Sequence, residues 1–361
     1  MDPEEFQRKR AEYLDRLILK NPVLNLLQNH PKDQYPYFIQ LFESLLQQMD
    51  EQGKLILPNL SAFTNNSLGI FSDYSGEGAG SSNYLTYSVL VCGYGYTSVF
   101  HDKMAQIRKK FQLGETEIAF KEFRRGKLRA ALPDYLAAAN ELPGFLCTVA
   151  VDRRIATLFG PHNDRTVFRR LKEGLLSEGL GDWDLAVVEK LMRVVHMAAY
   201  LAALLAADGQ KIFWMSDHDS ICPNEGKHGS MMAIFDRVLR IYTRPGVNYP
   251  LIGSARPFDP PSIEMNDLLS LADVVAGSVA QYLTKSDTES PEELVVKNGA
   301  ERVFLFLGTE GIGLRKATFV IRLNNNSEVD AGPMEIVARI PASHPMSERQ
   351  PKKPISPPTA E

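Results

Sequence analysis

The sequence predicts an α/β protein in which a mixed β-sheet is flanked by helices, with a helical extension at the N-terminus and a small β appendage at the C-terminus. Apolar, aromatic and β-branched runs of strand length occur within residues 68–73, 83–96, 144–154 and 210–220. Segments with apolar residues at helical spacing separate the later runs. A chain of 361 residues, 44% of them hydrophobic, can build the core that such a fold needs.

Composition and charge exclude several classes of protein. The net charge of -4 argues against a surface coated in positive charge, although it is compatible with a local basic groove for nucleic acid. The three cysteines are scattered without a CxxC spacing, so neither a disulfide framework nor a zinc site is predicted. The N-terminus lacks the apolar core of a signal peptide, and the longest apolar run, residues 194–207, is too short to cross a bilayer. We therefore expect a cytoplasmic protein with no membrane contact.

The N-terminal extension, residues 1–65, alternates charged and apolar positions at helical spacing. Residues 4–20 and 35–53 predict two amphipathic helices separated by a proline-containing break. These helices are expected either to pack onto the main body or to pair with a second copy of the chain, which would form a homo-oligomer.

The core, residues 66–287, begins with two strands joined by a glycine-rich turn, most simply an antiparallel hairpin over residues 68–93. A third strand is predicted at residues 116–123 and a fourth at 144–152, with a helix between them. A fifth strand, within residues 210–220, ends in acids, Asp217 and Asp219. Helices are expected over residues 98–113, 125–142, 164–180, 183–209, 229–242 and 267–283.

The C-terminal region differs from the core in composition. Residues 301–323 and 334–340 predict three short strands within a β-rich appendage, residues 288–343. These strands could form a small separate sheet or extend the core. The last segment, residues 344–361, is rich in proline and polar residues, which is typical of a disordered tail.

Acidic side chains follow several of the predicted strands. Asp73 ends the first strand in the stretch FSDYSGEG, and Asp152 ends the fourth. If the first and fourth strands are neighbours, both carboxylates project from one edge of the sheet, where α/β proteins bind ligands. Asp217 ends the next strand and could approach the same edge. The alternative is that Asp73 only caps its turn, that Asp152 pairs with an adjacent arginine, and that Asp217 and Asp219 belong to an ordinary loop.

A fourth carboxylate lies on a helix that is apolar on most sides. Counting by helical spacing from Asp273 reaches Asn266, Ser270, Gly277 and Gln281, a polar or small stripe. A buried carboxylate requires a partner. Asp267 lies off this stripe and is expected to be an ordinary acid at a helix N-terminus. The simplest partner for several carboxylates is a hard divalent cation, Mg²⁺ or Mn²⁺, and two such ions activate water in phosphodiester hydrolysis.

Several of these stretches carry a family resemblance. FSDYSGEG, YLTYSVLVCG, EIAFKEFRRGKLR, TVAVDRR and SLADVVAGSVAQYL resemble the domain of unknown function 3800 family over residues 68–285. That family opens with a strand ending in Asp-Glu-Ser-Gly and closes with a Leu-Gln-Leu-Ala-Asp helix. The resemblance implies an RNase H-like fold with an acidic, metal-binding centre. Here Tyr74 stands in place of the Glu, with Glu77 as a substitute, and Ser270 stands in place of the Gln.

The resemblance also implies roles for single residues. Asp73 and Asp273 take the places of the first and last acids, Asp152 that of a third carboxylate, and Glu117 or Glu122 that of an acid near the first helix. The function that follows is a divalent-metal-dependent nuclease or related phosphodiester hydrolase. Asp73, Asp152 and Asp273 are the predicted catalytic residues, and these three with Glu122 and Asp217 are the predicted ligands of Mg²⁺ or Mn²⁺.

Nucleic acid is the expected partner. Basic side chains after the third predicted strand would bind its phosphates, namely Arg124, Arg125, Lys127 and Arg129. The alternative is that this cluster is a solvated helix face balanced by nearby acids. The substitutions at Tyr74 and Ser270 favour a second hypothesis, a non-catalytic RNase H-like nucleic-acid-binding or assembly protein whose acidic centre has degenerated.

Overall fold

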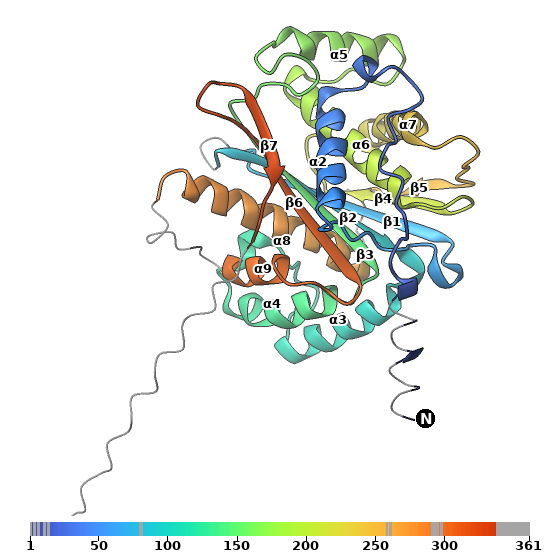
Figure 1. The fold of residues 1–361 in the computed structure, drawn as a ribbon. Coiled ribbons are helices and arrows are strands. Elements are labelled where there is room, and N and C mark those ends of the chain that lie inside the picture. The colour runs from blue at the N-terminus through green and yellow to red at the C-terminus, as the bar shows by residue number, and fades with distance from the viewer. Residues whose placement is uncertain are drawn as a thin grey trace, which may run out of the picture.

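The computed structural model describes residues 2, 5, 8, 9, 12, 15–78, 82–257, 259, 262–289, 296 and 299–336. The described chain forms three layers, in which helices cover both faces of one central sheet (Figure 1). Seven residues of the first predicted helix, residues 4–20, and all of the tail, residues 344–361, lie outside the described residues. The prediction of an α/β protein with a mixed sheet flanked by helices is confirmed.

The sheet has seven strands in the order β5-β4-β1-β2-β3-β6-β7. Their bounds are β1 Ser67–Ser75, β2 Tyr84–Gly93, β3 Gly144–Asp152, β4 Lys211–Ser216, β5 Ile252–Ser254, β6 Leu314–Leu323 and β7 Val329–Pro333. Strands β1, β2 and β3 are antiparallel neighbours, which confirms the predicted hairpin. Strand β4 runs parallel to β1, and β5 runs parallel to β4. The carboxyl ends of β1 and β4 therefore lie next to each other.

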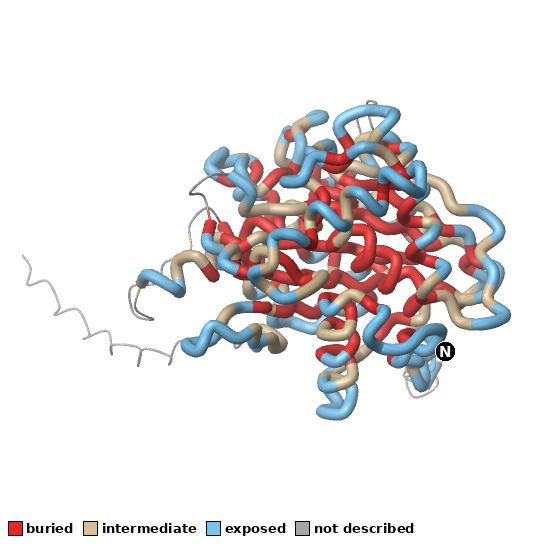
Figure 2. Tube along the Cα trace, turned by 90° about the horizontal axis from the view of Figure 1, so that it is seen from above, coloured by how far each residue is buried: buried red, intermediate tan, exposed pale blue. Residues whose placement is uncertain are grey.

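Helices divide between the two faces of the sheet. Their bounds are α2 Tyr37–Glu51, α3 Ser98–Phe111, α4 Gly126–Ala139, α5 Thr166–Ser177, α6 Leu185–Leu205, α7 Glu225–Tyr242, α8 Ile263–Ser286 and α9 Ala300–Leu307. One face carries α2, α5, α6 and α7, and the other carries α3, α4, α8 and α9 (Figure 1). Buried residues concentrate in the middle of the molecule, between these layers (Figure 2). Among the described residues, none of the helices combines the length and the apolar character needed to cross a bilayer.

The strand predicted at residues 116–123 is wrong. This segment is a loop that ends in a 3-10 helix, Phe120–Glu122. Its apolar side chains, Ile118 and Phe123, are buried under α8 rather than in the sheet. A short alternation of apolar and polar residues fits a packed loop as well as a strand. As a result, residues 144–152 form the third strand, which pairs with β2, and the fourth strand is β4.

The C-terminal segment also differs from its prediction. Residues 301–308, predicted as a strand, lie largely in α9, whose Ala300, Val303 and Phe306 are buried at the spacing of a helix. Strand β6 pairs in parallel with β3, so the strands of this segment extend the core sheet. The strand expected at residues 334–340 begins after the end of β7, and its last four residues lie outside the described residues.

Helix α2 packs onto the main body, which is one of the two alternatives for the N-terminal extension. The Phe42 ring contacts Tyr200 and Phe319 edge to face, with ring centroids 5.4 and 5.7 Å away. On the same helix, the buried Glu43 carboxylate accepts hydrogen bonds from the Leu26 amide and the Tyr200 hydroxyl, each 2.8 Å long. The segment before β1 is therefore part of the core.

Candidate metal centre

Two parallel strands place a pair of carboxylates side by side. Ser72 of β1 is the register partner of Ser216 of β4, and the next residues along the two strands are Asp73 and Asp217. The Asp217 amide donates to the Ser72 carbonyl over 3.0 Å, which continues the pairing beyond the end of β4. Because neighbouring strands lie about 4.8 Å apart, the two acids leave the sheet at adjacent points.

Helix α8 brings a third carboxylate across β1 and β2. The Thr86 hydroxyl of β2 donates to the Ala276 carbonyl of α8 over 2.9 Å, which ties the helix to the sheet. Asp273, one turn earlier on the helix, accepts a 2.6 Å hydrogen bond from the Phe120 amide. The loop that was predicted to be a strand thus uses a backbone donor to fix this carboxylate.

The same loop carries a fourth acid, Glu117. The Arg108 guanidinium of α3 donates to the carbonyls of Gly114 and Thr116 over 2.9 and 3.0 Å, and it forms a buried ion pair with Asp267 of α8. Arg108 thus connects the loop to α8 on the N-terminal side of Glu117, and the hydrogen bond from Phe120 to Asp273 connects it on the C-terminal side. Asp267, expected to be an ordinary acid near a helix N-terminus, is instead 1% exposed and locked in this pair.

These four acids surround one cavity of about 490 Å³. Its lining consists of Asp73, Tyr74, Glu117, Ala119, Lys121, Met215, Asp217, His218, Pro257, Asn266, Leu269 and Asp273. The acids come from β1, from the loop before α4, from the end of β4 and from α8. Residues almost 160 positions apart in the sequence, Glu117 and Asp273, therefore face the same space.

Burial and repulsion from neighbouring acids disfavour the charged forms of Asp73, Asp217 and Asp273. Burial raises the pKa of Asp273 to about 6, helped by repulsion from Glu117 and Asp217 and opposed by the Phe120 hydrogen bond. Burial, followed by repulsion from Asp217 and Asp273, raises the pKa of Asp73 well above its usual range. The pKa of Asp217 is also raised, chiefly by burial. Each of these groups would be stabilised in its charged form by a cation.

The cavity acids differ from the buried acids elsewhere in the described chain in having no ion-pair partner; Asp73 is buried, Asp217 and Asp273 are half-buried, and Glu117 is exposed. In the part of the chain that the structure describes, no ion pair joins Asp73, Glu117, Asp217 or Asp273 to Lys, Arg or His. The other buried acids are all satisfied by a basic group or by several donors: Glu43 by Leu26 and Tyr200, Asp152 by Arg154, Glu189 by Arg193, and Asp267 by Arg108. A charge left unpaired away from water is costly, so the cavity acids stand out.

The acids are not already gathered around a single point. Among the described residues, no group of three or more acidic, His or Cys side chains stands close enough together to hold a metal ion as placed. Repulsion between like charges favours such a spread arrangement when no cation is present. A cation would therefore have to draw the carboxylates inward.

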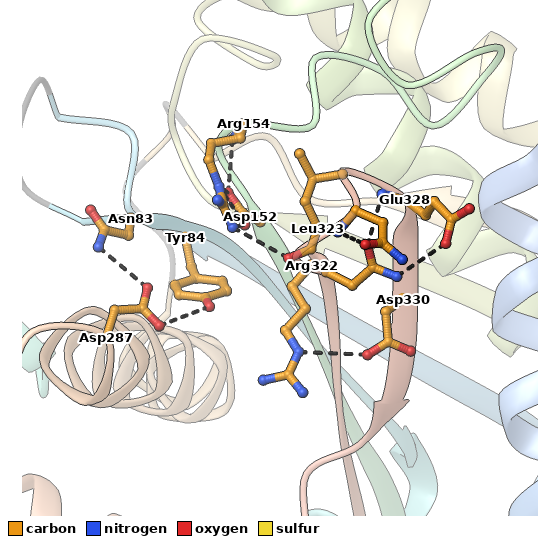
Figure 3. A network of polar contacts seen from close by, with 11 residues as sticks. Asn83, Tyr84, Asp152, Arg154, Asp287, Arg322, Leu323, Glu328 and Asp330 are labelled. Atoms are coloured by element: carbon orange, nitrogen blue, oxygen red, sulfur yellow. Dashed lines mark hydrogen bonds and ion pairs between the residues drawn. The ribbon is translucent and has the colours of Figure 1, made fainter.

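Asp152 does not belong to this group, contrary to the prediction. It ends β3, which is separated from β1 by β2, and its carboxylate forms an ion pair with Arg154. Figure 3 shows the pair beside the β6–β7 hairpin, where Arg154 also donates to the Leu323 carbonyl over 3.4 Å. Burial would raise the pKa of Asp152, but the hydrogen bonds from Arg154 outweigh it and hold the pKa below its usual value. The prediction failed because it took β3 for the neighbour of β1.

Glu122 also lies outside the cavity. It pairs with Arg125 over 2.6 Å, and of the two acids left open on this loop it is Glu117 that lines the cavity. The predicted phosphate-binding residues, Arg124, Arg125, Lys127 and Arg129, are exposed and do not line it either. Lys121, on the same loop, is the lysine at the cavity wall. The sequence pattern placed basic residues in this region but did not indicate which one faces the acids.

The loops that follow β1 and β4 are anchored from the opposite face of the sheet. Lys190 of α6 forms ion pairs with Glu77 and Asp219, and its ammonium group lies 4.7 Å from the centre of the Tyr74 ring. The Tyr74 hydroxyl bridges Ser72 and Ser216, with oxygen separations of 2.8 and 3.0 Å. Glu77 and Asp219 are thus engaged by Lys190, and neither lines the cavity.

Comparisons with known proteins identify no relative of this chain. No protein-family model, curated protein or solved structure matches the chain. What is known of the centre is therefore its geometry: four carboxylates from four segments around one cavity, at the carboxyl ends of two parallel strands.

Proposed function

We propose that this protein is a divalent-metal-dependent nuclease or related phosphodiester hydrolase on an RNase H-like core. The observation that carries the proposal is the cavity in which Asp73, Asp217 and Asp273 meet without a basic partner among the described residues. Keeping such charged acids together opposes stability, and a bound cation would offset this cost.

The strand arrangement supports an RNase H-like core. The order of strands and acids in the sequence leads us to expect three strands, a helical segment and a fourth strand beside the first, with an acid near the end of each of these two neighbours. Strands β1 and β4 meet that expectation. The acid after the fourth strand is Asp217, so the proposed set keeps Asp73, Asp217 and Asp273 of the predicted ligands, takes Glu117 in place of Glu122, and leaves out Asp152.

Carboxylate oxygens are the ligands that Mg²⁺ and Mn²⁺ prefer, so the donor set fits either cation. When bound, such ions activate a water molecule and stabilise the leaving oxygen of a phosphodiester. The chain's own groups orient the reaction: the Phe120 amide fixes the Asp273 carboxylate, and Lys121 places a positive charge at the wall of the cavity. A lysine in this position would attract a phosphate group.

The test combines metal binding with cleavage. Millimolar Mn²⁺ should raise the Tm of the wild type, because a ligand that binds only the native state stabilises it by mass action. Asp73→Asn and Asp217→Asn should lose both this rise and Mn²⁺-dependent cleavage of single- and double-stranded DNA and RNA. The matched control is Asp102→Asn, which changes an exposed acid on α3. Full cleavage by Asp73→Asn would refute the proposal.

A second candidate function is nucleic-acid binding without catalysis. Tyr74 occupies the place of an expected acid. Its hydroxyl forms hydrogen bonds with Ser72 and Ser216, so its side chain does not supply the missing carboxylate. Nucleic-acid binding that is unchanged in EDTA and in the Asp73→Asn variant, together with no Mn²⁺ effect on the Tm, would favour this function.

A further inference from the structure

A second cavity lies directly beside the acidic one. It has a volume of about 370 Å³ and is lined by Ser75, Gly76, Ser82, Phe120, Gly277, Ala280, Gln281, Thr284 and Lys285. The two cavities are lined by sequence neighbours: Tyr74 and Ser75 on β1, and Ala119, Phe120 and Lys121 on the loop before α4. On α8, Asp273 of the first cavity and Gly277 of the second are about one helical turn, or ~5.4 Å, apart.

The Phe120 ring lines this second cavity, and its sequence neighbours Ala119 and Lys121 line the acidic one. The Phe120 backbone is fixed by the hydrogen bond to Asp273, and the ring lies against Gly277, where a Cβ would stand 2.4 Å from the ring. Only glycine allows this close contact. The phenyl ring is half-buried, so one side packs on α8 while the cavity exposes another part.

The rest of the lining offers hydroxyl and amide groups with little charge. The hydroxyls of Ser82 and Thr284 are 2.7 Å apart, and Gln281 contributes a side-chain amide. Among the described residues of the lining, the cationic one is Lys285, which forms an ion pair with Glu289 over 3.3 Å. A phosphate would require more positive charge than this. An aromatic ring beside amide and hydroxyl groups is instead the chemistry that holds a nucleobase.

We propose that this cavity binds an unpaired base of the nucleic-acid strand whose phosphate lies at the acidic cavity. The inference rests on the proposed function and specifies its substrate: a single strand, or a nucleotide displaced from a duplex. A base inside a duplex is stacked and paired, so its face cannot reach Phe120 unless it is first extruded.

The first experiment compares three fluorescent strands of about 12 nucleotides: oligothymidine, an abasic strand with the same phosphates, and oligothymidine annealed to oligodeoxyadenosine. Binding to the wild type is measured in EDTA by fluorescence anisotropy. We expect the single strand to bind at least about fivefold more tightly than the other two, because the stacked base adds its own contact to those of the phosphates. Equal binding of the abasic strand, or no binding of any strand, would overturn the inference.

The second experiment uses variants of the cavity. Phe120→Leu keeps an apolar side chain but removes the aromatic face, and Gln281→Ala removes the amide. Both should weaken single-strand binding about fivefold or more and leave abasic binding unchanged. The matched control is Phe111→Leu, which alters a partly exposed ring on α3 outside the cavity. Equal losses on both strands, or no loss in either variant, would contradict base binding.

The two proposals fail in different ways. Base-dependent binding without Mn²⁺-dependent cleavage would refute the nuclease and keep the base site. Mn²⁺-dependent cleavage of single strands and duplexes at equal rates, with no preference for strands that carry bases, would keep the nuclease and refute the base site.

Discussion

At the scale of single residues, the cavity acids oppose the stability of the free protein. A carboxyl whose pKa is raised on folding holds its proton longer in the native state than in the unfolded state. Stability then falls as pH rises from the unfolded pKa, near 3.8, through the native value, which is about 6 for Asp273. The penalty is absent at low pH and complete above the native pKa.

This sign leads to the first prediction. In EDTA, Asp273→Asn should be more stable than the wild type above about pH 7, by on the order of 2–3 kcal/mol, because asparagine still accepts the Phe120 hydrogen bond but carries no charge. The difference should vanish near pH 4. Thermal unfolding at several pH values measures it, with Asp102→Asn as the control. A variant less stable than the wild type at pH 7 would show that Asp273 is stabilised by a partner in the native state.

Lys190 anchors the loops that follow β1 and β4, and it does so from the face of the sheet opposite the cavity. Its side chain is 8% exposed and pairs with Glu77 and Asp219. The second prediction is that Lys190→Met lowers the free energy of unfolding by about 3 kcal/mol, because it leaves Asp219 without its partner. The Mn²⁺-induced rise in Tm should shrink as well.

The conservative variant separates these two effects. Lys190→Arg retains the charge and should restore most of the Mn²⁺ response, even where its different shape lowers the Tm. If Lys190→Met keeps the full Mn²⁺ response, then Lys190 does not position the acids.

At the scale of elements, Gly277 allows the loop that carries Glu117 and Phe120 to pack on α8. A Cβ at this position would lie 2.4 Å from the Phe120 ring, so the ring and its loop would have to move. The third prediction is that Gly277→Ala costs about 1–3 kcal/mol and weakens the Mn²⁺ response. Chemical denaturation and thermal unfolding measure the two quantities.

A matched glycine serves as the control. Gly174 lies within α5, and a Cβ there meets no atom within 4 Å. Gly174→Ala should stabilise the protein by about 0.5–1 kcal/mol, because alanine restricts the unfolded chain more than glycine does. If both variants behave alike, the contact with Phe120 is not what Gly277 provides.

At the scale of the whole molecule, helix α2 closes one face of the core. Phe38, Ile39 and Leu46 are 0% exposed, and Phe42 lies against rings of α6 and β6. The fourth prediction is that deleting residues 1–53 exposes this face and abolishes cooperative unfolding. Size-exclusion chromatography and thermal unfolding test it. A truncated chain that remains folded with an unchanged Tm would show that α2 is an appendage.

A point variant tests the same packing without the risk that a truncated chain fails to fold. Phe42→Ala should cost about 3–5 kcal/mol while keeping the fold, because it leaves a cavity between aromatic rings. Tyr37→Ala, at a position 40% exposed on the same helix, should change stability by less than about 1 kcal/mol.

Most strands and helices of the core could be predicted, because burial on one face leaves a local periodicity in the sequence. The hairpin of β1 and β2, the acid-ended strand β4 and helix α8 all show it. Two short apolar segments misled the prediction. Residues 116–123 and 301–308 have too few positions for a period to distinguish strand, loop and helix.

The sequence by itself determined that Asp73 and Asp217 lie near the carboxyl ends of strands and that Asp273 lies on the polar stripe of an otherwise apolar helix. Only the tertiary structure decided that β4, and not β3, lies beside β1, and so that Asp217 rather than Asp152 faces Asp73. It likewise decided between Glu117 and Glu122. The reason is that periodicity reports which side of a segment is buried, whereas strand pairing and loop placement depend on contacts such as Arg108 with Asp267, 159 positions apart.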